Sequence, residues 1–275
     1  MRRLALVACL ALFAAPAQAQ FNLNLNRLLD LGKNVRQAAG GIDEAEEIEI
    51  GRDMAARLLG AAPLAADEAL QRYVNQVGRW LAAQTERPDL PWRFGVLEAP
   101  QLNAFATPGG HIFVPRGLLA RMASEAELAG VLAHEIAHVL RKHHLKAIQK
   151  AAQLELANTA LSLSRQDADA RKREKLLAAG TELFQRGLDK SDELEADRLG
   201  VVIAARGGYD AYGLPAVLQA LQAMNPEDSG LALMFKTHPA PAERLDALER
   251  LQPTLDAYGA QLQLAERFAG AAARR

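Results

Sequence analysis

Cysteine is nearly absent from this sequence: Cys9 is the only one in 275 residues, which excludes an internal disulfide. Aromatic side chains are also scarce, at 5% of the chain. No charge of one sign prevails, because 32 basic residues stand against 33 acidic ones. The formal net charge of -1 gives no reason to expect nucleic acid or another polyanion as a partner. Half of the residues are apolar, so a chain of this length is expected to bury one core.

Long apolar runs are missing beyond the N-terminus, and a membrane-spanning helix requires about 20 such residues. The first residues have a positive start at Arg2 and Arg3, an apolar run over 4–15 and a small-x-small ending at 17–19. This pattern is typical of a secretory signal peptide. We therefore expect residues 1–19 to be a signal peptide and the protein to be exported as a soluble protein of the periplasm.

The alternative interpretation of this N-terminus is a lipid anchor. The segment Leu6 to Cys9 superficially resembles the cleavage box of a lipoprotein, which would associate the protein with a membrane, such as the outer membrane. Only eight residues precede Cys9 and the apolar run continues past it, so the box would cut the signal through its middle. Cleavage after Ala19 is favoured, and the exported chain then has no cysteine for thiolate chemistry.

Helical spacing of apolar residues dominates the rest of the chain. After a flexible, Asn-rich leader at 20–41, we expect a main domain at 42–250 and a helical tail at 251–275. The predicted helices cover 42–59, 67–84, 124–146, one or two helices within 147–187, 191–206, 213–224 and 241–268. The predicted extended segments are 91–98, which alternates as a half-buried strand does, and 103–107 and 111–114, joined as a hairpin by Pro108-Gly109-Gly110. The fold class is therefore α+β, predominantly helical, with a small antiparallel sheet.

The predicted helix that begins after Ser124 carries the chemistry. Ser124 and Glu127 form a capping box that marks its start. The helix is apolar around nearly its whole circumference, as buried helices are, and only His134, Glu135 and His138 interrupt it. Burying such groups without partners costs on the order of several kcal/mol each, so the pattern indicates that something compensates for them.

A metal ion would compensate for these buried groups. His134 and His138 are four positions apart, so they project from one helix face as two ligands of a tetrahedral ion do. Glu135 lies about 100° around the helix, where it suits a base that acts on water. The alternative is a pair of interior histidines bonded to backbone or carboxylate groups. The order His-Glu-x-x-His in an apolar helix favours zinc.

A third ligand is expected in the acidic segment 189–200. Glu193 and Asp197 share one face of the predicted helix, whereas Glu195 points away. Glu193 is the candidate ligand, and Asp197 is expected to hold a ligand histidine or its neighbourhood through a hydrogen bond. Taken alone, the segment also fits the solvated, acidic start of a helix.

Four segments together resemble a known family. They are 103–114 (NAFATPGGHIFV), His134-Glu135-Ile136-Ala137-His138, Glu193-Leu194-Glu195-Ala196-Asp197 and Thr237-His238-Pro239. In this order, within residues 42–250, they are similar to the HtpX and CAAX prenyl endopeptidase family of zinc metallopeptidases, and most to its soluble periplasmic members of the BepA type. Asp189-Lys190 stands where relatives often have Ser-Arg. Many relatives carry membrane-spanning helices, which are not expected here, and neither is the processing of prenylated proteins.

The resemblance implies a zincin-like fold of the gluzincin type, in which His134, His138 and Glu193 hold one zinc ion and Glu135 is the catalytic base. It also implies an endopeptidase that uses zinc-activated water, with unfolded or misassembled envelope proteins as substrates. A role in protein quality control, and a partner in outer-membrane assembly or quality control, are expected on the same ground. The oligomeric state stays open.

Two further segments are candidates for the site. The main chain of Asn103, Ala104, Phe105 and Ala106 would offer a strand edge to an extended substrate, although a plain structural hairpin is the alternative. In relatives, the segment around His238 and the arginine six residues later approach the active site. His238 is expected to stabilise the oxyanion, to occupy the open zinc position and hold the enzyme inactive, or to be an ordinary loop residue. Three more histidines are expected at the surface: His111, His143 and His144.

Two rival functions stay open. A zinc-stabilised, chaperone-like protein would grip unfolded chains at the same strand edge without cutting them. A helical envelope adaptor would hold no metal at all. The enzyme is favoured because a structural zinc site has no use for Glu135 and usually closes its fourth position with a protein ligand, which only His238 would supply.

Overall fold

In the computed structural model, the described residues are 41–159, 165–224, 231, 234, 236–258 and 260–272. The chain divides into two units, Met1–Gly41 and Ile42–Arg275, and the described helices and strands belong to the second. The predicted signal peptide, Cys9 and the leader up to residue 40 lie outside the described residues. Within the described ranges, no helix combines the length and the apolar character needed to cross a membrane.

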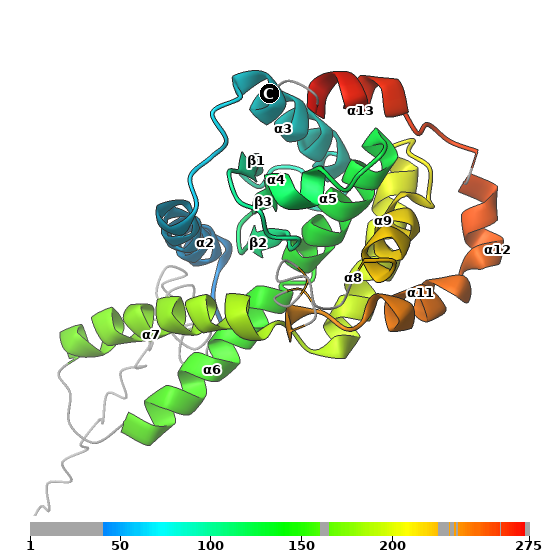
Figure 1. Cartoon of the computed structure of the whole chain (residues 1–275). Helices are drawn as coiled ribbons and strands as arrows, with labels where there is room; N and C mark the ends of the chain where they lie inside the picture. The colour runs from blue at the N-terminus through cyan, green and yellow to red at the C-terminus, as the bar shows by residue number, and fades with distance from the viewer. Residues whose placement is uncertain are drawn as a thin grey trace, which may run out of the picture. The chain divides into compact units, whose positions relative to one another are not determined.

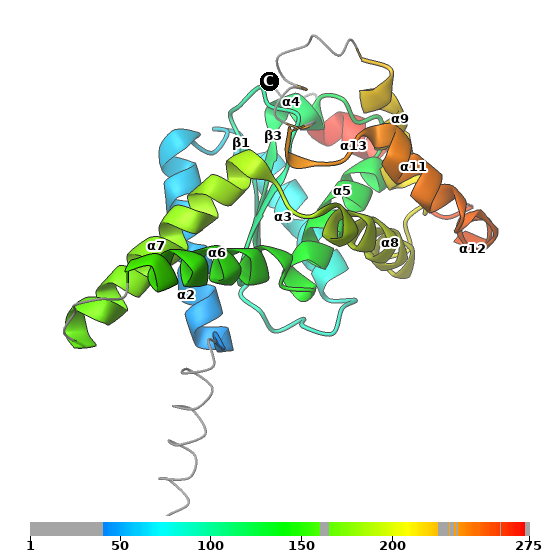
Figure 2. The ribbon, with the colours of Figure 1, turned by 90° about the horizontal axis from the view of Figure 1, so that it is seen from below.

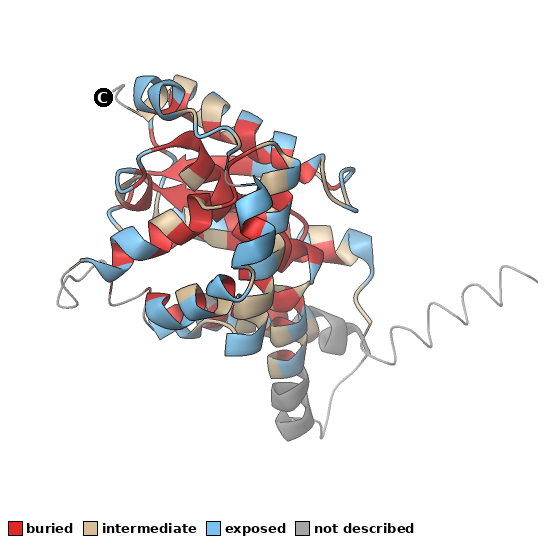
Figure 3. Ribbon diagram, turned by 90° about the vertical axis from the view of Figure 1, so that its right-hand side faces the viewer, coloured by how far each residue is buried: buried red, intermediate tan, exposed pale blue. Residues whose placement is uncertain are grey.

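α5 (Glu125–Leu140) is the central helix, with 15 of its 16 residues buried. α3 (Glu68–Ala82), α8 (Lys190–Arg206) and α9 (Gly213–Gln222) pack against it (Figure 1). Burial is concentrated around this helix and the neighbouring sheet, whereas the outer faces of the surrounding helices are exposed (Figure 3). The apolar circumference of the helix therefore reflects contact on nearly every side, as the sequence predicts.

The predicted capping box is present at the start of α5. Ser124 Oγ accepts a hydrogen bond from the N–H of Glu127 at 3.2 Å. The carboxylate of Glu127 accepts from the N–H of Ala123 at 2.8 Å, one residue earlier than the usual partner. These bonds fix the first turn, and the positions of the later side chains of α5 follow from it.

A three-stranded sheet lies beside α5 in the order β1-β3-β2. β2 (Phe105–Thr107) and β3 (His111–Pro115) form the predicted antiparallel hairpin, whose turn uses the positive φ values of Gly109 and Gly110. β1 (Arg93–Leu97) pairs with β3 in parallel, so the sheet is mixed rather than wholly antiparallel. Parallel strands need a longer connection than a tight turn, and the chain between β1 and β3 supplies it.

β1 is more deeply buried than its alternating sequence predicts, because Phe94 to Leu97 are all buried. α3 packs against this strand. Leu97 also belongs to an apolar cluster with Ala55 of α2 (Glu44–Ala61). The strand therefore has contacts on both faces. The alternation of polar and apolar residues in 91–98 predicts one solvent-exposed face, and β1 has none over residues 94–97.

α6 (His143–Thr159) and α7 (Arg165–Arg186) pack side by side as a helical pair (Figure 2). The helix predicted at 124–146 is thus two helices, because α5 ends at Leu140 and Lys142 adopts a left-handed φ of 57°. Apolar residues of the pair, including Ile148 and Leu176, pack on α2. This packing connects the pair to the sheet side of the fold.

The C-terminal region is divided more finely than its sequence periodicity predicts. The expected helix at 241–268 is replaced by α11 (Pro241–Glu249), α12 (Gln252–Leu255) with a 3₁₀ turn (Asp256–Tyr258), and α13 (Ala265–Ala272). Pro253 explains the first break, since proline favours the first turn of a new helix. α13 packs against α3 and α5, and α4 (Arg116–Leu119) follows β3 directly.

Candidate metal centre

Two histidines of α5 form the base of the site. His134 and His138 are both nearly inaccessible to solvent, at 3% and 1% exposure. Their Nε2 atoms face one another at 3.1 Å. This proximity follows from the four-residue spacing on one helix face, as predicted.

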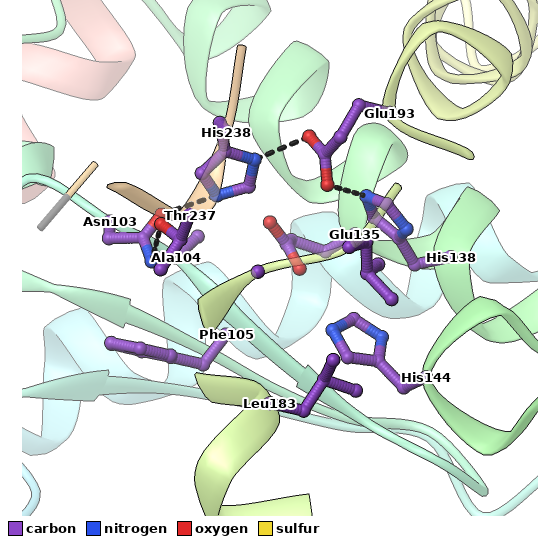
Figure 4. Close-up of a pocket in the computed structure, with 12 residues that line it drawn as sticks. Asn103, Ala104, Phe105, Glu135, His138, His144, Leu183, Glu193, Thr237 and His238 are labelled. Carbon is purple, nitrogen blue, oxygen red and sulfur yellow. Dashed lines mark hydrogen bonds and ion pairs between the residues drawn. The ribbon is translucent and has the colours of Figure 1, made fainter. Parts of the chain in front are cut away.

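Glu193 of α8 approaches the two histidines from the neighbouring helix. Its Oε2 lies 3.7 Å from His134 Nε2, and its Oε1 lies 3.5 Å from His138 Nε2. The structure therefore brings together the three predicted ligands, although Glu193 and His138 are 55 positions apart in the sequence. Figure 4 shows the carboxylate of Glu193 directed at His138, with Glu135 below it.

The donor atoms of this cluster suit a zinc ion. In a tetrahedral zinc site with ligand bonds of about 2.0–2.2 Å, the donors lie about 3.3–3.6 Å apart. The two histidine nitrogens are 3.1 Å apart, and Glu193 approaches each of them with a different oxygen, at 3.7 and 3.5 Å. With one atom from each residue, the three donors lie within 4.8 Å of one another, so a small closure of the cluster would bring them into that range. Moreover, Oε1 of Glu193 is buried and has no hydrogen-bond partner among the described residues. A buried carboxylate oxygen without a partner is costly unless a cation compensates for it.

The protonation states of Glu193 and His138 also favour metal binding. Burial raises the pKa of Glu193, but His238, His134 and Arg244 outweigh it and lower this pKa to about 2. Burial and the neighbouring charge of His134 hold the pKa of His138 well below its usual value. Glu193 is thus an anion and His138 a neutral imidazole, which are the forms that bind zinc.

Asp197, one helical turn after Glu193, orients His134. Its Oδ1 lies 2.8 Å from His134 Nδ1, which leaves the Nε2 of that ring directed at the donor cluster. Burial and Arg244 disfavour the charged form of His134, but Asp197 and Glu193 outweigh them and raise its pKa. The hydrogen bond predicted for Asp197 is therefore present.

Arg244 of α11 in turn holds Asp197. Its Nε donates to Oδ2 at 2.8 Å and its terminal nitrogen donates to Oδ1 at 2.5 Å. Burial opposes ionisation of Asp197, yet the charge and hydrogen bonds of Arg244 keep the pKa of Asp197 well below its usual value. Spacing alone gives no sign of this pair, because the two residues are 47 positions apart. The resemblance to relatives predicts Arg244 near the active site but not its pairing with Asp197.

His143 is a residue that the sequence interpretation placed wrongly. It is 2% exposed, not a surface residue, and its Nδ1 lies 3.0 Å from Nδ1 of His138. Its other nitrogen, Nε2, lies 3.4 Å from the carboxylate of Glu195. Helical periodicity cannot reveal this contact, because the chain turns at Lys142 between the two histidines. His143 therefore fixes the orientation of the His138 ring through its Nδ1 atom, on the side away from the donor cluster.

The two other histidines predicted at the surface are also partly enclosed. His144 lines the cavity at the site, and burial lowers its pKa to about 4. Its ring lies 5.2 Å from the ring of His138. His111 begins β3 and is partly buried, so the surface assignment is wrong for His144 and too simple for His111.

Glu135 projects from α5 beside the donor cluster and is 3% exposed. Burial raises its pKa above the usual value for glutamate, against the charges of His134 and His238. It lines both cavities that meet at the site. A carboxylate whose affinity for a proton is raised in this way is suited to accept and return one.

His238 lies over the cluster in a short segment before α11. Its Nδ1 contacts Oε2 of Glu193, and its Nε2 is 2.6 Å from Oδ1 of Asn103 (Figure 4). Asn103 also donates to Thr237 Oγ1 at 3.2 Å. His238 is thus brought to the site, and its role there stays a prediction.

The predicted substrate edge is only partly in place. Asn103, Ala104 and Phe105 line the cavity beside Glu135. Regular pairing begins at Phe105, so the two residues before it belong to no strand. Ala106 is fully buried in the sheet and does not line the cavity.

Comparison with known proteins identifies the family. Residues 68–252 match the family described as peptidase family M48. The chain belongs to this family. The match confirms the metallopeptidase resemblance at the level of M48, and a mostly helical fold with a small sheet agrees with it.

Curated relatives of this M48 member include proteases from bacteria and yeast. The beta-barrel assembly-enhancing protease of Escherichia coli (strain K12) is 30% identical over 86% of this chain and 49% of the relative. Its counterpart in Yersinia pestis is 31% identical over 80% of this chain and 47% of the relative. The mitochondrial metalloendopeptidase OMA1 of Schizosaccharomyces pombe is 32% identical over 66% and 52%. The chain spans about half the length of these relatives.

Proposed function

We propose that this M48 protein is a zinc metalloendopeptidase. The observation that carries the proposal is the buried cluster of His134, His138 and Glu193, with Glu135 directly beside it. Two neutral imidazoles and one carboxylate are the donor set of catalytic zinc sites, in which a fourth position stays open. Zinc bound there would supply a Lewis acid that polarises a peptide carbonyl and lowers the pKa of water.

Glu135 performs the proton transfers in the proposed reaction. It accepts a proton from the attacking water and passes it to the nitrogen that leaves when the peptide bond breaks. Burial prepares it for this task by raising its pKa. The reaction needs no covalent intermediate, because water is the nucleophile.

The surrounding residues keep the site in position. Asp197 and His143 each bond the Nδ1 of one of the two cluster histidines, so both rings direct Nε2 inward. Arg244 neutralises Asp197 in a buried pair. This arrangement fixes the orientation of the donors before any substrate arrives.

An extended polypeptide is the substrate that fits the rim of the site. Asn103 and Ala104 border the cavity and lead directly into β2, which supports pairing of this segment with a substrate main chain. Main-chain pairing requires an unfolded segment and reads little of its sequence. We therefore propose unfolded or misassembled proteins of the cell envelope as substrates.

The cellular setting is proposed from the N-terminus and the relatives. The signal-like residues 1–19 support export to the periplasm, and the assembly-enhancing relatives support a role in envelope quality control with an outer-membrane assembly partner. The narrower resemblance to the HtpX and CAAX prenyl endopeptidase branch supports the same activity and stays a prediction. The domain limits at 42–250 and 251–275 also stay predictions.

Casein digestion tests the enzymatic proposal. The Glu135→Gln variant should lose cleavage by at least about 1,000-fold, because it cannot carry the proton, yet it should bind the same zinc, since Glu135 is not among the donors. Glu68→Gln, an exposed residue of α3, serves as the matched control and should cleave normally.

The two rival functions give different results in the same assay. A zinc-stabilised chaperone would leave casein intact in the unchanged protein and in both variants. An adaptor without metal would contain far less than one zinc per chain by elemental analysis.

A further inference from the structure

A groove separate from the metal centre lies where α13 packs on α3, next to the turn that follows α8 (Figure 1). It encloses about 830 Å³, including its open mouth. Its walls include Tyr73, Val77 and Trp80 of α3, together with Tyr209, Leu262 and Arg267. The residues that line it border neither of the two cavities at Glu135, so the groove is a distinct feature of the surface.

Two large apolar side chains of this groove are open to solvent. Trp80 is 53% exposed and Leu262 is 58% exposed, the two highest values among the large apolar residues that the structure describes. Val77 and Tyr209, which also line the groove, are buried beside them. Exposed apolar side chains around a hollow are typical of a surface where another molecule binds.

Hydrogen bonds hold the three aromatic rings of the groove in place. Trp80 Nε1 donates to the carbonyl oxygen of Gly207 at 2.8 Å. The hydroxyls of Tyr73 and Tyr209 each donate to the carboxylate of Glu125 at 2.7 Å. Rings that are already fixed lose little conformational freedom on binding, and tryptophan, tyrosine and arginine contribute most at protein interfaces. The groove therefore fits a protein partner.

Unpaired arginines flank the tryptophan end of the groove. Arg79 and Arg206 are the chain neighbours of the two residues that the indole hydrogen bond joins, so their backbones lie close together at the rim. Both side chains are exposed, and neither forms an ion pair with another described residue. Acidic side chains of a partner would find cations here, whereas basic ones would be repelled.

The position of the groove leaves the metal centre accessible. Glu125, which bonds the two tyrosines, is nine positions before His134 on α5, or about 13 Å along the helix axis. A segment bound in the groove therefore does not fill the cavities at Glu135. The occupant that fits is a partner protein rather than the polypeptide that is being cut.

We propose that this groove docks a segment of a partner protein that combines one large apolar side chain with acidic neighbours. The apolar side chain enters the groove beside Trp80 and Leu262, and the acidic side chains lie at Arg79 and Arg206. This surface takes no part in the proposed cleavage, so the two proposals are tested separately.

Three synthetic peptides serve as probes, and the zinc-loaded Glu135→Gln variant is the protein, so that no peptide is cut. The first peptide carries one phenylalanine between acidic residues. The second has alanine in place of the phenylalanine, and the third has lysines in place of the acids. By fluorescence anisotropy, the first should bind at least about tenfold more tightly than each of the others, because it alone offers both the ring and the negative charge.

Variants of exposed residues locate the binding. Trp80→Ala should weaken binding of the first peptide by roughly tenfold or more. Arg79→Glu combined with Arg206→Glu should abolish the preference for acids over lysines. Arg52→Glu, at an exposed arginine of α2, is the matched control and should change neither result. With Glu135 intact, all these variants should cut casein normally, which also shows that they fold.

Four outcomes would overturn the proposal. They are equal binding of the three peptides, binding of the first peptide that Trp80→Ala leaves unchanged, and no saturable binding of it below about 1 mM. The fourth is binding to phosphatidylglycerol vesicles that depends on Trp80 and occurs without selectivity among the peptides, which would identify a membrane surface instead.

The cleavage assay separates a partner from a substrate. If the first peptide inhibits casein cleavage and Trp80→Ala abolishes the inhibition, the groove holds a segment of the substrate, and the assignment to a partner is wrong. If the peptides bind as expected but the unchanged protein cuts no casein, the peptidase proposal is wrong and the docking groove stands.

Discussion

His143 supports the ring of His138 from the side opposite Glu193. The Nδ1 atoms of the two histidines lie 3.0 Å apart, and Glu195 lies beyond His143. Burial and the neighbouring positive charges keep the pKa of His138 low, so the His138 ring is neutral and one of its nitrogens carries the hydrogen. A proton on Nδ1, donated to His143, leaves Nε2 free to bind a metal.

Replacing His143 should therefore weaken metal binding. We expect His143→Ala to lower the affinity for zinc by about 10–100-fold, the usual effect of losing a partner that orients a ligand. His143→Gln should restore part of the loss, because its amide oxygen accepts the same hydrogen bond. The measurement is competition with a chromogenic chelator, supported by the absorption spectrum of the cobalt form. His111→Ala is the control, and equal affinities in all four proteins would contradict this role.

At the scale of residues, the sequence predicts which side chains share the face of one helix. It does not predict which side chains a turn of the chain brings into contact. His134 and His138, or Glu193 and Asp197, are four apart, so helical geometry alone places each pair on one face. The contact of His138 with His143 depends on the left-handed backbone of Lys142, which no periodic pattern encodes. Glu193 was a candidate because the two histidines need a third ligand and because it shares a helix face with Asp197, but the packing of α8 on α5 that joins it to the histidines cannot be read from spacing.

At the scale of helices, Gly200 determines how closely α8 approaches α5. A Cβ atom added at Gly200 would lie 2.9 Å from backbone atoms of His134, closer than side-chain carbons come in folded proteins. The missing side chain therefore lets the helix that carries Glu193 pack directly on the helix that carries the histidines. Small residues at a helix crossing shorten the distance between the axes.

We expect Gly200→Ala to separate the two helices. The free energy of unfolding should fall by about 1–3 kcal/mol, as in other overpacked cores, and zinc affinity should fall with it because Glu193 moves away. Chemical denaturation of the metal-free protein and chelator competition measure the two effects. Gly60→Ala is the matched control: nothing lies near its added Cβ, so it should be neutral or raise stability by up to about 1 kcal/mol. A Gly200→Ala protein as stable as Gly60→Ala would show that the approach is not tight.

The sequence predicted the presence of helices better than the residues at which they end. The periodicity of 67–84 and 191–206 gives α3 and α8 nearly to the residue. The break between α5 and α6 was missed because Lys142 and the histidines after it are acceptable helix residues. The parallel pairing of β1 with β3 was also missed, because partner choice between strands depends on contacts distant in sequence.

At the scale of the whole molecule, Glu47 joins segments that are far apart in the chain. This fully buried carboxylate of α2 accepts from Arg87 at 2.9 Å and from Lys142 at 2.7 Å. Burial raises the pKa of Glu47, but the bonds and charges of Arg87 and Lys142 outweigh it, and the pKa is lowered below its usual value of 4.5. One side chain thus connects α2, the loop after α3 and the end of α5.

This ion pair should make stability depend on acidity. Because the pKa of Glu47 is lower in the folded state, its stabilisation is complete above pH 4.5 and is lost as the pH falls through the folded-state value. Glu47→Gln should cost about 2 kcal/mol at pH 7, less than a fully buried pair because Lys142 is partly exposed. Denaturation at pH 7 and below pH 4 should show that the variant loses less stability on acidification than the unchanged protein.

A control separates this effect from the general response of carboxylates to acid. Glu68 pairs with Arg72 on the exposed face of α3, so Glu68→Gln should change stability by no more than about 0.5 kcal/mol at either pH. If Glu47→Gln and the unchanged protein lose equal stability on acidification, the pKa of Glu47 is not lowered by folding.

The enclosure of α5 also limits how this scaffold can diversify. With 15 of 16 positions in contact with neighbours, almost any change on that helix disturbs either a donor or the core. α9 is different: Gln219, Ala220 and Gln222 face solvent, while Val217 and Leu218 on its inner side border a cavity beside Glu135. Selection experiments that seek new cleavage preferences should therefore place their libraries on α9 and leave α5 untouched.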